Sequence, residues 1–162
     1  MPVAAGLAAN EIIAAIWALS VAYSDVTERR IPNDLVFGAA LVCLFVLAWD
    51  GQAPLGGSPI SVAGGFGLAL LLTLPGYLTH RLGAGDVKML VVVATMGGYM
   101  LVLQTFVIGA LIAGAVAMGC LFMRSHPWGA SLPQTGRFLP FGAALACGLI
   151  LAILFESGLS LP

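Results

Sequence analysis

The chain has 162 residues, of which 60% are hydrophobic and only 8% are charged, and its formal net charge at pH 7 is -1. So few charged side chains cannot cover a water-soluble globule of this length, so that class is excluded. No basic stripe points to a nucleic-acid partner. The apolar stretches approach or exceed ~20 residues, the length of a membrane helix, and lack the alternation of outer-membrane strands. The composition therefore predicts an all-α, polytopic protein embedded in the lipid bilayer.

Six apolar segments are expected to form transmembrane helices. They span 7–24, 35–49, 60–78, 87 to about 97, 105–123 and 138–155. Pro32 and Asn33 separate the first two, because proline disfavours helix in the residue before it and asparagine is a good helix N-cap. The apolar run 87–123 is nearly twice as long as one crossing requires, so we place a reversal between 97 and 104. This reversal leaves a short fourth helix.

The loops and basic residues predict the orientation. Residues 50–59 and 124–137 are rich in Gly, Pro and Ser and are expected as loops. With six crossings, all six basic residues fall on one side of the membrane, and basic residues near helix ends mark the cytoplasmic side. Both termini are then expected on the non-cytoplasmic side. The whole chain, 1–162, is expected to form a single transmembrane domain.

The cysteines give no sign of a metal site. Cys43, Cys120 and Cys147 stand singly in apolar runs, with no CxxC pair. Neither a disulfide framework nor a zinc site is predicted, and no metal or other cofactor is expected.

Two aspartates are the main candidates for chemistry. Asp25 follows the first apolar segment and Asp86 opens the fourth, so both are expected at the cytoplasmic face. Taken alone, Asp86 is equally well explained as a helix N-cap, and Asp25 as a loop carboxylate paired with Arg29. Together they suggest an aspartyl protease, because one of two adjacent carboxylates holds a proton while the other stays charged.

Glycines flank the second aspartate. Gly83 and Gly85 permit backbone conformations that other residues avoid, and they let a substrate strand approach closely. The GxGD pattern is weak by itself in a chain with 21 glycines. It gains weight from its place at a helix start and from Asp25 on the same side.

Three motifs of this sequence resemble those of the type IV prepilin peptidases, a family of polytopic aspartyl proteases. Residues 25–33, DVTERRIPN, are similar to the family's first-aspartate motif, in which Ile-Pro-Asn follows at a fixed spacing. Residues 83–88, GAGDVK, resemble its GxGDxK motif. Residues 138–143, FLPFGA, resemble its Pro-Phe-Gly-Pro segment, with Ala143 in place of the last proline.

The resemblance implies a membrane endopeptidase that removes the leaders of prepilins and pseudopilins at the cytoplasmic face of a bacterial or archaeal inner membrane. It implies no cofactor, and it makes the pilus assembly machinery a further candidate partner. Asp25 and Asp86 carry over as the catalytic pair. Positions of structural or substrate-positioning role are Pro32, Asn33, Gly83, Gly85, Lys88, Pro140 and Gly142. The chain lacks the cysteine-bearing cytoplasmic segment of the long members, and it is similar to the short, peptidase-only form of tight-adherence (Flp-type) pilus systems.

Other functions are weighed against this one. Presenilin-like proteases also use a GxGD aspartate, but they place Tyr directly before the first Asp, where this chain has Ser24. A small transporter would use paired carboxylates near the bilayer midplane, often in two related halves, and no halves are evident here. A non-catalytic assembly subunit is a third alternative.

Overall fold

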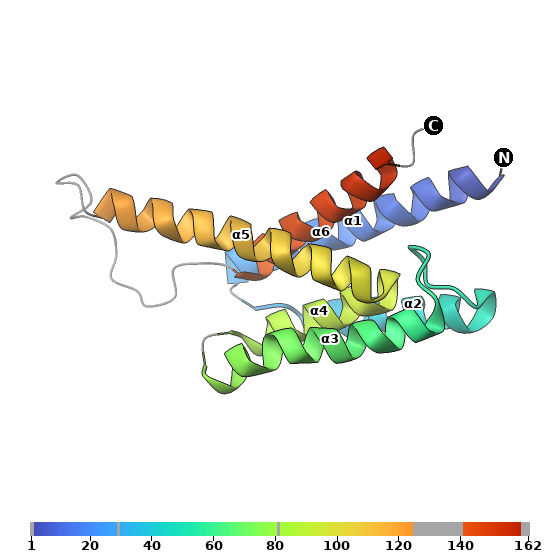
Figure 1. Ribbon diagram of the computed structural model, residues 1–162, viewed down its shortest axis with the longest axis horizontal. Helices are drawn as coiled ribbons and strands as arrows, with labels where there is room; N and C mark the ends of the chain where they lie inside the picture. The colour runs from blue at the N-terminus through green and yellow to red at the C-terminus, as the bar shows by residue number, and fades with distance from the viewer. Residues whose placement is uncertain (1, 29, 81, 125–140, 160–162) are drawn as a thin grey trace.

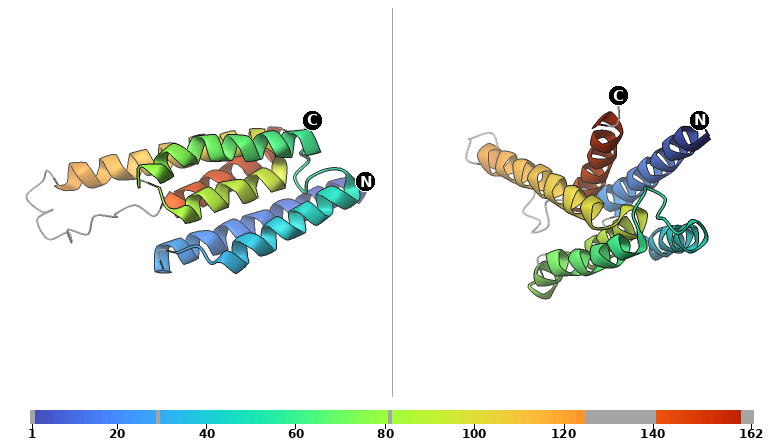
Figure 2. Two further views of the ribbon diagram at one scale, coloured as in Figure 1. Left: turned by 90° about the horizontal axis from the view of Figure 1, so that it is seen from below. Right: turned by 45° about the vertical axis from the view of Figure 1, so that its right-hand side comes forward.

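The computed structural model describes residues 2–28, 30–80, 82–124 and 141–159, and six helices account for most of them. They are α1 (Pro2–Glu28), α2 (Asn33–Asp50), α3 (Pro59–Leu78), α4 (Ala84–Gly97), α5 (Tyr99–Arg124) and α6 (Phe141–Leu159). Successive helices run in opposite directions, so the start of α1 and the end of α6 lie at one end of the bundle (Figures 1 and 2). The prediction of an all-α protein is confirmed for this part of the chain.

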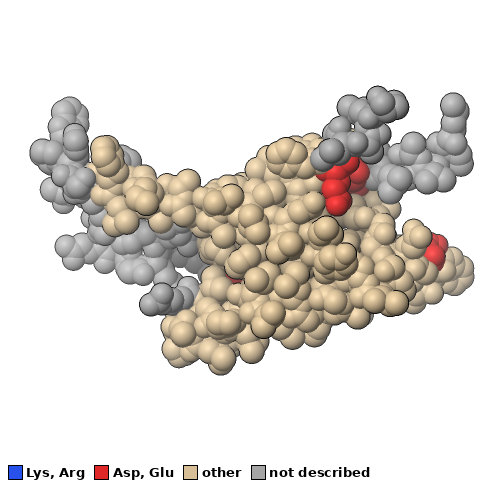
Figure 3. All heavy atoms as spheres, viewed as in Figure 1, with Lys and Arg blue, Asp and Glu red and all other residues tan. Residues whose placement is uncertain are grey.

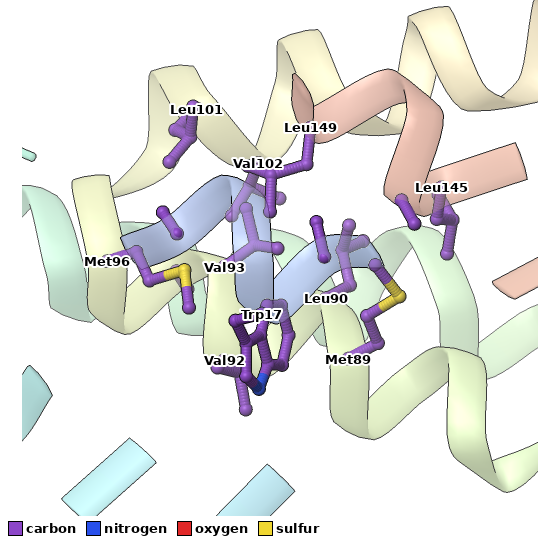
Figure 4. Close-up of a cluster of buried hydrophobic side chains, with 14 of the residues drawn as sticks. Trp17, Met89, Leu90, Val92, Val93, Met96, Leu101, Val102, Leu145 and Leu149 are labelled. Atoms are coloured by element: carbon purple, nitrogen blue, oxygen red, sulfur yellow. The ribbon is translucent and has the colours of Figure 1, made fainter. Parts of the chain in front are cut away.

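Helix α4 lies at the centre of the bundle. It packs against α2, α3, α5 and α6, while α1 packs mainly along α6. Met89, Leu90 and Val93 of α4 are completely buried. Figure 4 shows side chains from α1, α5 and α6 converging on this helix, among them Trp17 and Leu149. The first turn of α4 is therefore held by neighbours on several sides.

The predicted reversal and the short fourth helix are confirmed. Helix α4 has 14 residues, and Gly98 makes the turn with a φ of 83°, a conformation that glycine adopts without strain. The loop between α2 and α3 closes this end, because the Leu55 N–H donates to the carbonyl oxygen of Met96 at 2.8 Å. Helix α5 begins at Tyr99, six residues before the start predicted at 105, because the turn needs only Gly98.

Two details near the first aspartate differ from the prediction. The first helix does not end before Asp25 but continues to Glu28, since no helix-breaking residue precedes Pro32. Asp25 is therefore a helical residue. Asn33 does not cap α2, because Pro32 occupies the N-cap position and no side-chain cap hydrogen bond forms there.

The surface agrees with a membrane protein. Among the described helices, α2, α3 and α5 are long and apolar enough to cross a bilayer, and α6 carries a shorter apolar stretch, Phe141–Ser157. Large apolar side chains on α2 and α5 face outward, including Phe45, Trp49 and Leu111. The described residues on the face in Figure 3 are almost entirely uncharged. A surface of this kind is suited to lipid contact.

Neighbouring glycines of α3 provide a test of this packing. A Cβ built at Gly65 would lie 2.8 Å from the backbone carbon of Gly98, whereas nothing lies within 4 Å of one built at Gly64. Gly65→Ala should therefore lower the free energy of unfolding by ~1–3 kcal/mol, as overpacking does. Gly64→Ala should be neutral or raise it by up to ~1 kcal/mol through helix propensity. Unfolding in detergent micelles measures both, and equal stability of the two variants would contradict the close approach of α3 to the α4–α5 turn.

Candidate active site

The described residues of the three sequence motifs lie at one end of the bundle. The last turn of α1 and the first turns of α2, α4 and α6 lie there, and the ends of α1 and α6 adjoin in Figure 1. Free backbone N–H groups are exposed at every helix start, where they favour acidic partners. Asp25 and Asp86 thus lie at the end of the bundle where α2, α4 and α6 begin.

Asp25 connects the first helix to the last one. Its carboxylate Oδ2 accepts a hydrogen bond from the backbone N–H of Ala143, at 2.9 Å across 118 positions of sequence. Ala143 lies in the first turn of α6, where an N–H has no partner within its own helix. The absence of a side chain at Gly142 permits this contact, because a Cβ there would lie 2.9 Å from the same carboxylate oxygen.

Asp86 lies in the first turn of α4 and is only 8% exposed. Its Oδ2 accepts the backbone N–H of Gly83 at 3.0 Å, and its own N–H donates to the carbonyl of Gly83 at 3.2 Å. The residue at the N-cap is therefore Gly83, not Asp86. Asp86 stands three residues further on and bonds back to the cap, as the acidic member of a capping box does.

Ile31 connects the surroundings of the two aspartates. It lies in the link between α1 and α2, partly buried against the hydrophobic core. A Cβ built at Gly85 and one built at Gly142 would each lie 3.2 Å from its Cδ1. Gly85 directly precedes Asp86, and Gly142 adjoins the carboxylate of Asp25. The Ile-Pro-Asn segment thus touches both sides of the candidate site.

Lys88 binds the start of α2. Its Nζ donates to the Asn33 side-chain oxygen at 2.8 Å and lies 6.0 Å from the centre of the Phe37 ring. This contact joins the second motif to the first, two residues after Asp86.

Of the remaining predicted positions, Pro32 lies within the described residues and Pro140 does not. Pro32 precedes α2 with a φ of -58° and a ψ of 134°, the extended backbone that turns the chain from α1 into α2. Pro140 lies outside the described residues, as does Arg29, the alternative partner considered for Asp25. Within the described ranges, no group of three His, Cys, Asp or Glu side chains is arranged to hold a metal ion.

Two groups at the candidate site were not identified from the sequence motifs. The Ala143 N–H is a backbone donor, which carries no residue-specific signal. Ile31 was part of a quoted motif, but its contacts with α4 and α6 come from the fold. Glu11 and Glu156 lie on α1 and α6, which pack along each other. Glu11 is about 20 Å from Asp25 along α1, so this pair is remote from the site.

Comparison with protein families decides the relationship. The family model of the type IV leader peptidase family matches residues 12–118, more than half of the chain. The chain belongs to the type IV leader peptidase family. The match contains both aspartates, whereas α6, which supplies the N–H bound to Asp25, follows it. Searches of curated proteins and of solved structures gave no significant match.

Membership of the leader peptidase family makes the protein a peptidase and fits a membrane protein whose partners are prepilins. It also favours the prepilin-peptidase interpretation over the presenilin-like one. The observed arrangement has two carboxylates at one end of a helical bundle, one buried and one half-buried, each oriented by a backbone N–H. A carboxyl group oriented in this way can accept or donate a proton.

The bond between Lys88 and Asn33 is testable by a double-mutant cycle. Lys88→Met and Asn33→Ala should each lower the free energy of unfolding, and together they should cost less than the sum. We expect a coupling energy of ~0.5–1.5 kcal/mol, because the bond has a charged donor but lies near the surface. Unfolding in detergent measures it, with Lys88→Arg as the variant that keeps the charge. Additive effects would mean that the two side chains do not interact.

Proposed function

We propose that this protein is an aspartic endopeptidase that removes the leader peptides of type IV prepilins and pseudopilins, with Asp25 and Asp86 as its catalytic pair. One observation carries the proposal. In a chain of the leader peptidase family, both motif aspartates lie at the same end of the bundle, next to the glycines that contact Ile31. Each hydrogen bond taken alone could be a structural cap, that of Asp86 on α4 and that of Asp25 on α6, so it is the family match across both aspartates that supports a catalytic pair.

The chemistry is acid–base hydrolysis of one peptide bond. The charged carboxylate takes a proton from a water molecule, whose oxygen attacks the carbonyl carbon of the scissile bond. The protonated carboxyl group donates to the carbonyl oxygen. The tetrahedral intermediate then breaks its C–N bond, the nitrogen leaves with a proton, and the pair regains its starting state. The two groups act as a coupled unit, so we assign no separate role to either.

The proposed topology brings substrate and site to the same depth. We place six helices across the membrane with the end that carries Asp25 and Asp86 in the cytoplasm, because Arg30 and Lys88 lie at that end. A prepilin is itself a membrane helix whose leader is cytoplasmic, so its cleavage point would meet the carboxylates at the headgroup level. The whole chain would serve as a single peptidase domain without N-methylation activity.

The supporting motif positions would act through geometry. Gly83 and Gly85 leave room beside Asp86, Gly142 leaves room for Asp25, and Lys88 with Asn33 fixes α2. Pro32 would direct the chain into α2, and Pro140 would have the structural or substrate-positioning role that its motif implies. These roles need no metal or cofactor.

Substitution of either aspartate tests the proposed pair. Asp25→Asn and Asp86→Asn should each lower the rate of leader removal by at least ~100-fold, the usual contribution of an acid–base group. The measurement is the gel shift of a co-expressed prepilin. Asp50→Asn is the matched control, because Asp50 is an exposed aspartate at the far end of α2 and should not affect cleavage. Normal cleavage by membrane-inserted Asp25→Asn and Asp86→Asn proteins would disprove the pair.

Chelation separates this mechanism from a metallopeptidase. Leader removal by the purified protein should be unchanged in EDTA, because the proposed proton transfers use only carboxyl groups. The assay compares initial cleavage rates with and without chelator. A loss of activity that added zinc restores would show that a metal ion takes part.

A further inference from the structure

We propose that Ile31 is a positioning residue of this peptidase, whose side chain sets the spacing between the Asp25 end of α1 and the first turns of α4 and α6. The inference rests on the proposed function, since it concerns the alignment of the catalytic pair. It assigns a role in the reaction to a residue that contributes no polar group.

Two features of the sequence restrict the Ile31 side chain. Pro32 follows it, and a residue before proline is restricted to extended conformations. Isoleucine is also branched at Cβ, which limits rotation about χ1. A side chain that is restricted in both ways is suited to hold neighbouring elements at a set distance.

A single methyl group reaches two helices. A Cβ built at Gly85 of α4 would lie 3.2 Å from Cδ1 of Ile31 and 3.3 Å from its Cγ1. One built at Gly142 of α6 would lie 3.2 Å from the same Cδ1. Both glycines thus leave space that the Ile31 side chain adjoins, and Cδ1 is common to the two contacts.

Each of these glycines precedes a residue on which the pair depends. Gly85 precedes Asp86, and Gly142 precedes Ala143, whose N–H binds the carboxylate of Asp25. A change in the size of residue 31 would therefore move both carboxyl groups relative to each other. Displacement of reacting groups by about 1 Å can cost on the order of 100-fold in rate.

The test is a double-mutant cycle between residues 31 and 85. For each purified full-length variant, kcat and KM of leader cleavage are measured, together with the Tm of the protein. Ile31→Val removes Cδ1, and Gly85→Ala adds the methyl group that would crowd it. We expect each single substitution to lower kcat by about 10-fold or more, with KM changed less than twofold. The double variant should regain most of the lost kcat, because the added methyl group then occupies the emptied space.

A matched control separates positioning from packing. Ile153→Val removes the same methyl group from a buried residue of α6 that lies three turns from its start. It should lower Tm as much as Ile31→Val does, but leave kcat unchanged. If Ile31→Val lowers Tm without lowering kcat, Ile31 is only a packing residue and the inference is wrong. The inference is also wrong if the kcat of the double variant is no higher than that of the single variants.

The outcome for the inference is distinguishable from that for the proposed function. Cleavage that requires Asp25 and Asp86 while kcat is insensitive to residue 31 overturns the inference alone. Cleavage that does not require the two aspartates overturns the proposed function, and the positioning role with it.

Discussion

The hydrogen bond between the Ala143 N–H and the Asp25 carboxylate is the contact on which the candidate site depends. It satisfies a donor that the first turn of α6 cannot pair internally, and it fixes a carboxylate at the end of α1. Helices α1 and α6 pack along each other, and the bond holds the end of α1 against the start of α6. A typical intramolecular hydrogen bond contributes ~0.5–1.5 kcal/mol net, so this part-buried bond also favours the stability of the arrangement.

Helix α4 holds the second aspartate of the candidate site. Its side chains fill the centre of the bundle, and its first turn carries Asp86 in a capping arrangement with Gly83. A carboxylate that accepts a backbone N–H is oriented before any substrate arrives, and preorganisation of this kind lowers the cost of reaction. In the proposed mechanism the same hydrogen bond would serve both the helix and the chemistry.

The sequence predicted most of the fold and the placement of Asp25 and Asp86 at one end of the bundle, but few of the contacts around them. Six apolar runs with alternating direction necessarily bring Asp25 and Asp86 to one side, and the excess length of 87–123 demanded a turn, found at Gly98. The end of α1 was misplaced because its last turn contains ordinary helix residues and no breaker. The partners of Asp25 and Asn33 could not be predicted, since a backbone N–H has no sequence signal and Lys88 is 55 positions from Asn33.

The loop beneath α4 has a consequence for the supply of water. Residues 53–57 fold back on themselves and bond to the last turn of α4, with Ala53 buried and Gly57 close against the backbone of Gly97. This closes the end of the central helix that lies opposite the carboxylates. In the proposed mechanism each hydrolysis event consumes one water molecule, which would enter from the end where Asp25 and Asp86 lie. Peptide and water would share one entrance, so a bound leader would itself control hydration of the bond to be cut.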